Sequence, residues 1–263
     1  MHWGRLVTVD PLLLVVMIAS LLIGGLVNGI IGIGFALFAV NFLAVALGTK
    51  EGVIVMSILA LFPAGYQLWR TRSYWPTWVR LRGLLIGGLA GSLLGAVLLV
   101  WLPAWAISIA LGLFTGQFVI DQARRRGPPI STKVERRMAP VAGFFSGMTN
   151  GALGAAGPVA GSFLLAIGLR GREFIFGISF VFLFLALVRI VLFMAQGQYS
   201  PQLVLIGLAL LIPTMGGQAI GLRLQGKANP QVFQRLLLSV LFVSSVSLLV
   251  RGGQGMLAWL NGG

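Results

Sequence analysis

Two asparagines, Asn28 and Asn150, stand at the head of glycine-rich stretches inside long uncharged segments of the chain. The stretches read Asn-Gly-Ile-Ile-Gly-Ile-Gly and Asn-Gly-Ala-Leu-Gly-Ala-Ala-Gly-Pro. An amide in apolar surroundings needs hydrogen-bond partners, because an unpaired buried polar group is costly. Each asparagine therefore either caps a broken helix, a structural role, or donates its NH₂ hydrogens to a bound anion. The residues alone leave both roles open.

The glycines of these stretches would let backbone N–H groups approach a ligand closely. A helix that begins just after the break would direct the positive end of its dipole to the same place, and a proline suits its first turn. Close packing of two helical hairpins also needs glycine, and the two uses are compatible. The candidate positions are Gly32, Gly34, Gly154, Gly157 and Pro158.

Arg189 is the one charged residue well inside an apolar segment, roughly 12 Å of helix from the end of that segment. An intramembrane arginine either extends to the lipid headgroups or belongs to a functional site, and for an anion carrier we favour the site. Gln67, 122 positions earlier, is also polar and is a further candidate. Ser57 and Ser179 share that spacing; they could bond to their own backbone, the usual case, or contact the anion.

The remaining polar residues do not assemble a catalytic site. Glu51 and Glu173 begin equivalent segments, where an acidic side chain suits a helix N-terminus; a role in proton coupling is the weaker alternative. Gln117 and Gln218 are further amides that we expect along the path. The chain has no cysteine, and its one histidine, His2, is at the terminus. We therefore expect no metal site, no cofactor and no enzyme.

The composition excludes a soluble protein. The chain has 263 residues, of which 58% are hydrophobic and 9% are charged, whereas a soluble domain carries about 25% charged residues. A water-facing surface cannot be built from so few charges, which excludes a soluble enzyme, a nucleic-acid binder and a disordered regulator. The net charge of +14 reflects basic loops between apolar segments. We expect an all-α polytopic membrane protein with no nucleic-acid partner.

The apolar segments 11–48 and 138–169 are too long for one helix and short for two, so we interpret both as hairpins of broken helices. If each hairpin returns to its starting side, 15 of the 19 Lys and Arg residues fall on one face, which the positive-inside rule makes cytoplasmic. Both termini then face outward. The other predicted spans are about 52–69, 83–101 and 104–120, and about 173–196, 202–222 and 232–250, with a basic linker at 122–137 and a tail at 251–263.

The two halves, residues 1–121 and 138–250, resemble each other. Asn28-Gly29 matches Asn150-Gly151 at an offset of 122, and so do several later pairs. After an insertion of four residues in the second half, the stretch Gly91-x-x-x-Gly95 matches Gly217-x-x-x-Gly221. Each half holds a hairpin and three spans, an odd number of crossings, so the second half is inverted. Inverted repeats are common in secondary transporters, whose site lies at the repeat interface near the membrane midplane.

A glycine-rich hairpin opening each half, a basic linker and a G-x-x-x-G span together resemble the sulfite exporter family TauE/SafE, also called TSUP. The similarity extends from about Leu21 to Val250. The hairpins depart from the family's denser glycine pattern, reading Gly-Ile-Gly-Phe-Ala from Gly32 and Gly-Ala-Ala-Gly-Pro from Gly154. The resemblance implies a membrane transporter of sulfur-containing or organic anions such as sulfite, sulfonates and sulfoacetate.

We therefore expect a multi-pass protein of the cell inner membrane that exports such an anion by alternating access around a midplane site. The alternative is an anion channel with a continuous pore. The sequence has no P-loop, so we do not expect this chain to use ATP. The expected partners are a small anionic substrate and the lipid bilayer, with a homodimer left open.

Overall fold

The computed structural model describes residues 11–32, 35–123, 131–224 and 230–260, and every regular element in these ranges is a helix. The first half holds α1 (Pro11–Ile31), α2 (Phe35–Leu47), α3 (Thr49–Arg70), the 3₁₀ helix η1 (Arg72–Thr77), α4 (Trp78–Trp101) and α5 (Ala104–Ala123). The second half holds α6 (Thr132–Leu153), α7 (Gly157–Ala166), α8 (Gly171–Ala195), α9 (Pro201–Leu224) and α10 (Pro230–Leu260).

Four helical segments in the described ranges are long and apolar enough to cross a bilayer. A crossing helix needs about 20 mostly apolar residues, and the shortest of the four has 22. They are Thr49–Arg70, Arg72–Trp101, Gly171–Ala195 and Pro201–Leu224. The predicted class, an all-α polytopic membrane protein, is confirmed.

Each predicted hairpin consists of a long helix and a shorter return helix. α1 has 21 residues and α6 has 22, roughly the thickness of the hydrocarbon core. The return helices α2 and α7 have 13 and 10 residues. The long helices end at Gly32 and Gly154, whose φ angles of 82° and 74° lie in the left-handed region that favours glycine. Gly32 and Gly154, two of the predicted tip glycines, thus end the first helices of the first and the second hairpin.

Glycines line two close helix contacts, one between α4 and α6 and one between α1 and α9. A Cβ atom added at Gly91 would lie 1.9 Å from the carbonyl oxygen of Phe144, and one at Gly217 would lie 2.0 Å from that of Leu22. Such distances leave no room for a side chain, so the helix backbones touch. The two G-x-x-x-G stretches in the sequence are therefore packing surfaces.

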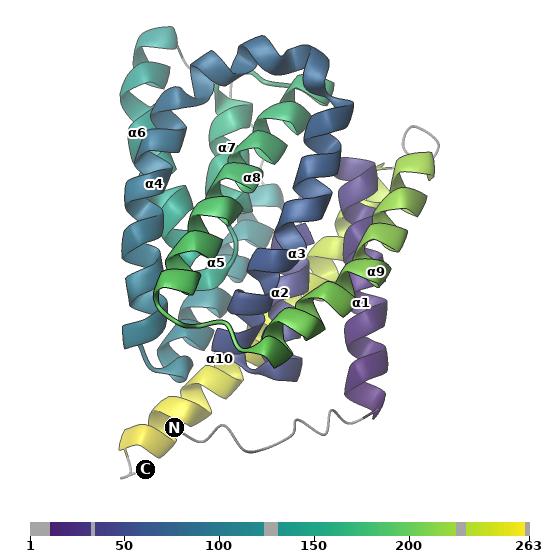
Figure 1. Cartoon of the computed structure of the whole chain (residues 1–263), viewed down its shortest axis with the longest axis vertical. Coiled ribbons are helices and arrows are strands. Elements are labelled where there is room, and N and C mark those ends of the chain that lie inside the picture. Colours follow the sequence, from purple (N-terminus) through teal and green to yellow (C-terminus); the bar gives the residue numbers. More distant parts are fainter. Residues whose placement is uncertain (1–10, 33–34, 124–130, 225–229, 261–263) are drawn as a thin grey trace.

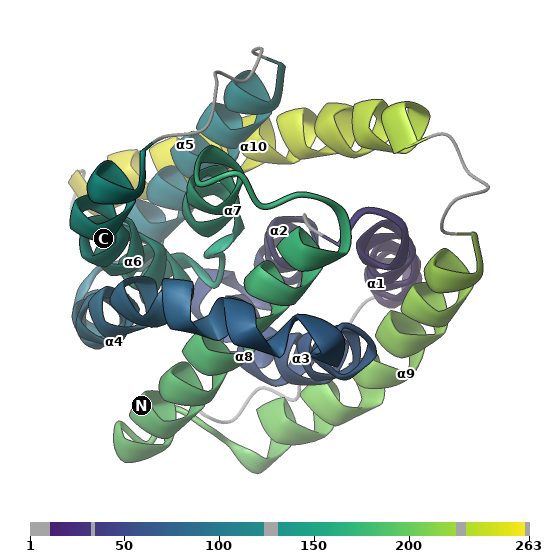
Figure 2. The same cartoon turned by 90° about the horizontal axis from the view of Figure 1, so that it is seen from above.

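Each of these contacts joins a helix of one half to a helix of the other half. α1 of the first half packs on α9 of the second, and α6 of the second half packs on α4 of the first (Figure 2). α3 lies against α8, and α5 against α10. A two-fold relation between the halves would produce this exchange, which is what an inverted repeat requires. The repeat stays a prediction, and the helix pairing is consistent with it.

The ends of the helices sort into two groups. Figure 1 shows the end of α3, the start of α4 and the start of α6 at one end of the molecule, and the α4–α5 and α8–α9 connections at the other. α1 runs toward the first of these ends, and α2 returns (Figure 1). The two helices of the hairpin run in opposite directions, and the return of the chain to its starting side of the membrane stays a prediction. We call the end with the start of α4 the basic end, because Arg70, Arg72, Arg80 and Arg82 lie in or beside this connection.

Three predicted boundaries differ from the structure. α4 begins at Trp78, five residues before the predicted 83, and α6 begins at Thr132, inside the predicted linker. α10 continues to Leu260, through most of the predicted tail. This extension packs closely on α5: a Cβ at Gly255 would lie 2.9 Å from the Cβ of Trp105.

Candidate functional site

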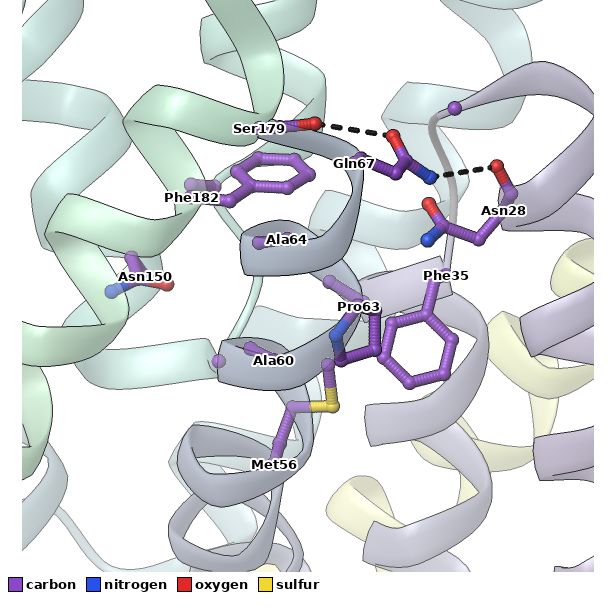
Figure 3. A pocket seen from close by; sticks show the side chains of 14 residues that line it. Asn28, Phe35, Met56, Ala60, Pro63, Ala64, Gln67, Asn150, Ser179 and Phe182 are labelled. Atoms are coloured by element: carbon purple, nitrogen blue, oxygen red, sulfur yellow. Dashed lines mark hydrogen bonds between the residues drawn. The ribbon is translucent and has the colours of Figure 1, made fainter. Parts of the chain in front are cut away.

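A cavity lies where the two hairpin turns approach α3 and α8 (Figure 3). We call it the central cavity. Six of its lining residues are among those predicted from the sequence: Asn28, Gly32, Gln67, Asn150, Gly154 and Ser179. The others are apolar: Phe35, Ala36, Met56, Ala60, Pro63, Ala64, Ala156 and Phe182. Residues 122 positions apart in the chain thus line one space.

Gln67 holds the turn of the first hairpin. Its Nε2 donates a hydrogen bond of 3.0 Å to the carbonyl oxygen of Asn28, which also accepts the backbone N–H of Gly32 at 2.8 Å (Figure 3). The Oε1 of Gln67 accepts a bond of 3.1 Å from the hydroxyl of Ser179 on α8 (Figure 3). This chain of bonds fixes the amide of Gln67 and joins the first hairpin to both α3 and α8.

Arg189 has the same place at the second hairpin. Its Nη1 donates to the carbonyl oxygen of Asn150 at 2.7 Å, and that oxygen also accepts the N–H of Gly154 at 3.0 Å. Nη1 also lies 3.4 Å from Oδ1 of Asn150. Arg189 is fully buried, 0% exposed, so it does not extend to the headgroups as the structural alternative required. It does not line the central cavity.

The two asparagine amides differ, although both line the central cavity. Nδ2 of Asn150 donates to the carbonyl oxygen of Leu185 at 3.1 Å. The equivalent carbonyl in the first half belongs to Pro63, and it accepts Nε2 of Gln218 at 3.1 Å instead. The side-chain amide of Asn28 has no hydrogen-bond partner among the described residues, and it points into the cavity (Figure 3). Only one of the two predicted amide donors is therefore free.

The return helices begin at the cavity wall. Phe35 and Ala36 of α2 line it, and so does Ala156, which precedes α7. The first N–H groups of a helix have no acceptor within the helix, and the helix dipole is positive there. Gly157 and Pro158 form the first turn of α7, as predicted, without lining the cavity. Gly34 lies outside the described residues.

A second cavity adjoins the first at the basic end. We call it the basic vestibule. It shares Asn28, Gly32 and Gln67 with the central cavity and adds Gly29, Arg70, Thr71, Arg172, Ile175 and Leu222. Its free volume is about 80 Å³, against about 20 Å³ for the central cavity. The smaller volume admits about one water molecule, so a larger ligand enters only if the hairpin turns move apart.

The remaining predicted polar residues lie elsewhere. The hydroxyl of Ser57 bonds to that of Tyr199 and to its own helix at Ile54, outside the central cavity. Gln218 is buried and holds α3, whereas Gln117 is exposed on α5 and lines neither cavity.

Glu51 and Glu173 stand in the first turns of α3 and α8, as predicted. Tyr199 was not predicted from the sequence, because it lies in a connection outside the predicted spans. Pro63 was not predicted either, although a proline inside an apolar span is a visible sign of irregular backbone.

A polytopic helical protein with two broken-helix turns at a shared cavity has the architecture typical of membrane transporters. The model of the family Sulfite exporter TauE/SafE matches residues 16–248. The chain belongs to this family of membrane transporters, as the sequence resemblance indicates. Comparison with curated proteins and with solved structures finds no match.

Proposed function

We propose that the protein is a secondary transporter that exports a small sulfur-containing or organic anion through the central cavity by alternating access. Sulfite, sulfonates and sulfoacetate are the substrates that the family suggests. The observation that carries the proposal is the free amide of Asn28, which faces the cavity beside the starts of α2 and α7. An amide N–H and helix N-termini are donors, and donors favour an anion over a cation.

The charges around the two cavities support an anionic substrate. No acidic residue is among the described residues that line them, and Arg70 and Arg172 line the basic vestibule. Both arginines are exposed, so they can attract an anion from solution without holding it strongly. The anion would then meet Asn28 and Gln67, which line both cavities.

The closure of the opposite side favours a carrier over a channel. Beyond the central cavity, Ser57 of α3 bonds to Tyr199 in the α8–α9 connection, and the ring of Tyr199 lies 6.4 Å from that of Phe193. The free volume of about 20 Å³ in the central cavity leaves room for about one water molecule. A carrier that opens to one side at a time fits this arrangement.

Transport by the purified protein in proteoliposomes tests the proposal. We expect saturable uptake of radiolabelled sulfite, competition by methanesulfonate or sulfoacetate, and counterflow when the vesicles are preloaded with unlabelled sulfite. Uptake that rises linearly with concentration, without counterflow, would indicate a channel. Uptake equal to that of protein-free liposomes for all three anions would refute the proposed function.

A further inference from the structure

Arg189 uses only part of its guanidinium group. Nη1 binds Asn150, but Nε and Nη2 are buried and have no hydrogen-bond partner among the described residues. These two nitrogens form one edge of the planar group, with N–H bonds that point the same way. That edge can bind two oxygens of one anion side by side, in the fork geometry by which arginine recognises oxyanions.

The positive charge of Arg189 also lacks a partner. In the described part of the chain the one ion pair joins Arg80 to Glu135, at 2.8 Å, and no carboxylate pairs with Arg189. A buried charge is costly unless it is paired and hydrogen-bonded. Intramembrane arginines accordingly face a partner or a ligand pathway. The free edge of Arg189 is thus suited to an anion that the protein itself does not supply.

The surroundings of Arg189 correspond to those of Gln67. A Cβ added at Gly32 would meet Ile175, with Gln67 next to it; a Cβ added at Gly154 would meet Val40, Arg189 and Val53. Val53 is 122 positions before Ile175. The side chain of Gln67 faces the basic vestibule, whereas that of Arg189 is sealed. Arg189 therefore occupies, in closed surroundings, the position that Gln67 occupies beside the basic vestibule.

Tyr199 lies near Arg189. This residue lies within electrostatic range of the guanidinium, bonds to Ser57 and packs beside the fully buried Phe193. Because Tyr199 belongs to the short connection between α8 and α9, it can separate from Ser57 without unwinding a helix. Its separation would open Arg189 toward the end of the molecule opposite to the basic end.

We propose that the free Nε–Nη2 edge of Arg189 is a second anion subsite, which takes the paired oxygens of a sulfite, sulfonate or carboxylate group. It becomes accessible from the end opposite the basic loops when Tyr199 separates from Ser57. This subsite rests on the proposed transport function and adds a second, charged station to the path. Chloride, which has no pair of oxygens, cannot use the fork in the same way.

The decisive variant is Arg189→Gln, which places at position 189 the residue type found at the equivalent position 67. Gln67 shows that a glutamine at this place can hold a hairpin turn through its amide. Glutamine at position 189 should therefore keep the bond to Asn150 while it removes the charge and the fork. We expect sulfite transport in proteoliposomes to fall at least tenfold, Arg189→Lys to be intermediate, and the preference for methanesulfonate over chloride as competitor to decrease in both.

Two controls separate binding from folding. Arg251→Gln removes an exposed arginine whose one hydrogen bond to the described residues goes to the carbonyl oxygen of Val45, so transport should be unchanged. The second control does not measure transport. Because the chain has no cysteine, Val53→Cys gives a single reporter beside the subsite. Methanesulfonate should slow its labelling by a membrane-impermeant thiol reagent, and this protection should disappear when Arg189→Gln is added.

The outcomes distinguish the two proposals. If the wild-type protein moves neither sulfite nor methanesulfonate, the proposed function fails. If the wild-type protein transports and Arg189→Gln transports equally well with the same competitor preference, the subsite is refuted and Arg189 only holds the hairpin. The subsite is equally refuted if transport falls but methanesulfonate protects Val53→Cys to the same extent with and without Arg189.

Discussion

Asn28 and Asn150 occupy equivalent positions, yet the structure predicts opposite consequences for their replacement by alanine. Asn28→Ala should impair transport and leave stability nearly unchanged, because its amide has no partner among the described residues and faces the central cavity. Asn150→Ala should lower stability, because its amide joins the second hairpin to α8 through the carbonyl oxygen of Leu185. A simple symmetry argument would predict equal effects.

The magnitudes follow from the hydrogen bonds lost. Asn150→Ala removes one bond of 3.1 Å and a weaker contact of 3.4 Å to Arg189, which together stabilise the fold by about 1–2 kcal/mol. Asn28→Ala removes no protein bond, so its effect on unfolding should stay within about 0.5 kcal/mol. If the amide of Asn28 donates to a bound anion, its loss costs about 1.5–3 kcal/mol of binding, roughly a tenfold to hundredfold rise in the half-saturating concentration.

Thermal unfolding in detergent and sulfite transport in proteoliposomes measure the two effects on the same preparations. Gln117→Ala, which removes an exposed amide from α5, is the matched control and should change neither. Equal losses of stability in the two asparagine variants would refute the assignment of Asn28 as the free amide. Unchanged transport in Asn28→Ala would refute its role as an anion contact.

Three further predictions concern packing, orientation and the hairpin turn. Gly91→Ala should lower the unfolding temperature because its Cβ would lie 1.9 Å from a backbone oxygen, whereas Gly65→Ala, with nothing within 4 Å, should leave it equal or raise it; the same loss in both would contradict the packing argument. Single cysteines at Lys133 and Gln198 should react with impermeant reagents from opposite faces, the first from the cytoplasm, and reaction from one face would disprove the inverted topology. Gly154→Ala should slow transport, because position 154 has a φ of 74° and its Cβ would lie 3.1 Å from Val40; transport at the wild-type rate would show that the turn tolerates a side chain.

Six residues that line the central cavity could be predicted from the sequence, because the two halves need similar residues at equivalent positions. In each half, a polar side chain must donate a hydrogen bond to a carbonyl oxygen of the hairpin turn. Gln67 of α3 does so in the first half and Arg189 of α8 in the second. A glycine at 32 or 154 is needed where the long helix ends with a positive φ. Such local requirements leave residues at a constant spacing, which the sequence displays.

The differences between the halves were not predictable, because they depend on distant neighbours. Which asparagine stays free is decided by Gln218, which is 155 residues from Pro63 and takes its carbonyl oxygen. Beyond residue 250, α10 contacts Trp105 of α5, which lies far away in the chain. Neither contact produces a pattern of composition or spacing within one segment of the sequence, so neither could be predicted from the sequence.

The two halves have different residues at equivalent positions, Gln67 in the first and Arg189 in the second. The two ends of the proposed path therefore attract an anion in different ways. At the basic end, Arg70 and Arg172 are exposed, so water and salt screen their charges and the deeper residue is a neutral amide. Toward the opposite end, where Lys50 and Arg251 lie among the described residues, the deeper residue is a buried arginine whose field is screened much less. The attraction of one buried charge for the anion can therefore be similar to that of several exposed charges. With similar attraction at both ends, the anion can leave from either one. On the proposed mechanism, an arginine in place of Gln67 would add a buried charge to an end that already has exposed ones, which accounts for an amide there and a guanidinium at 189.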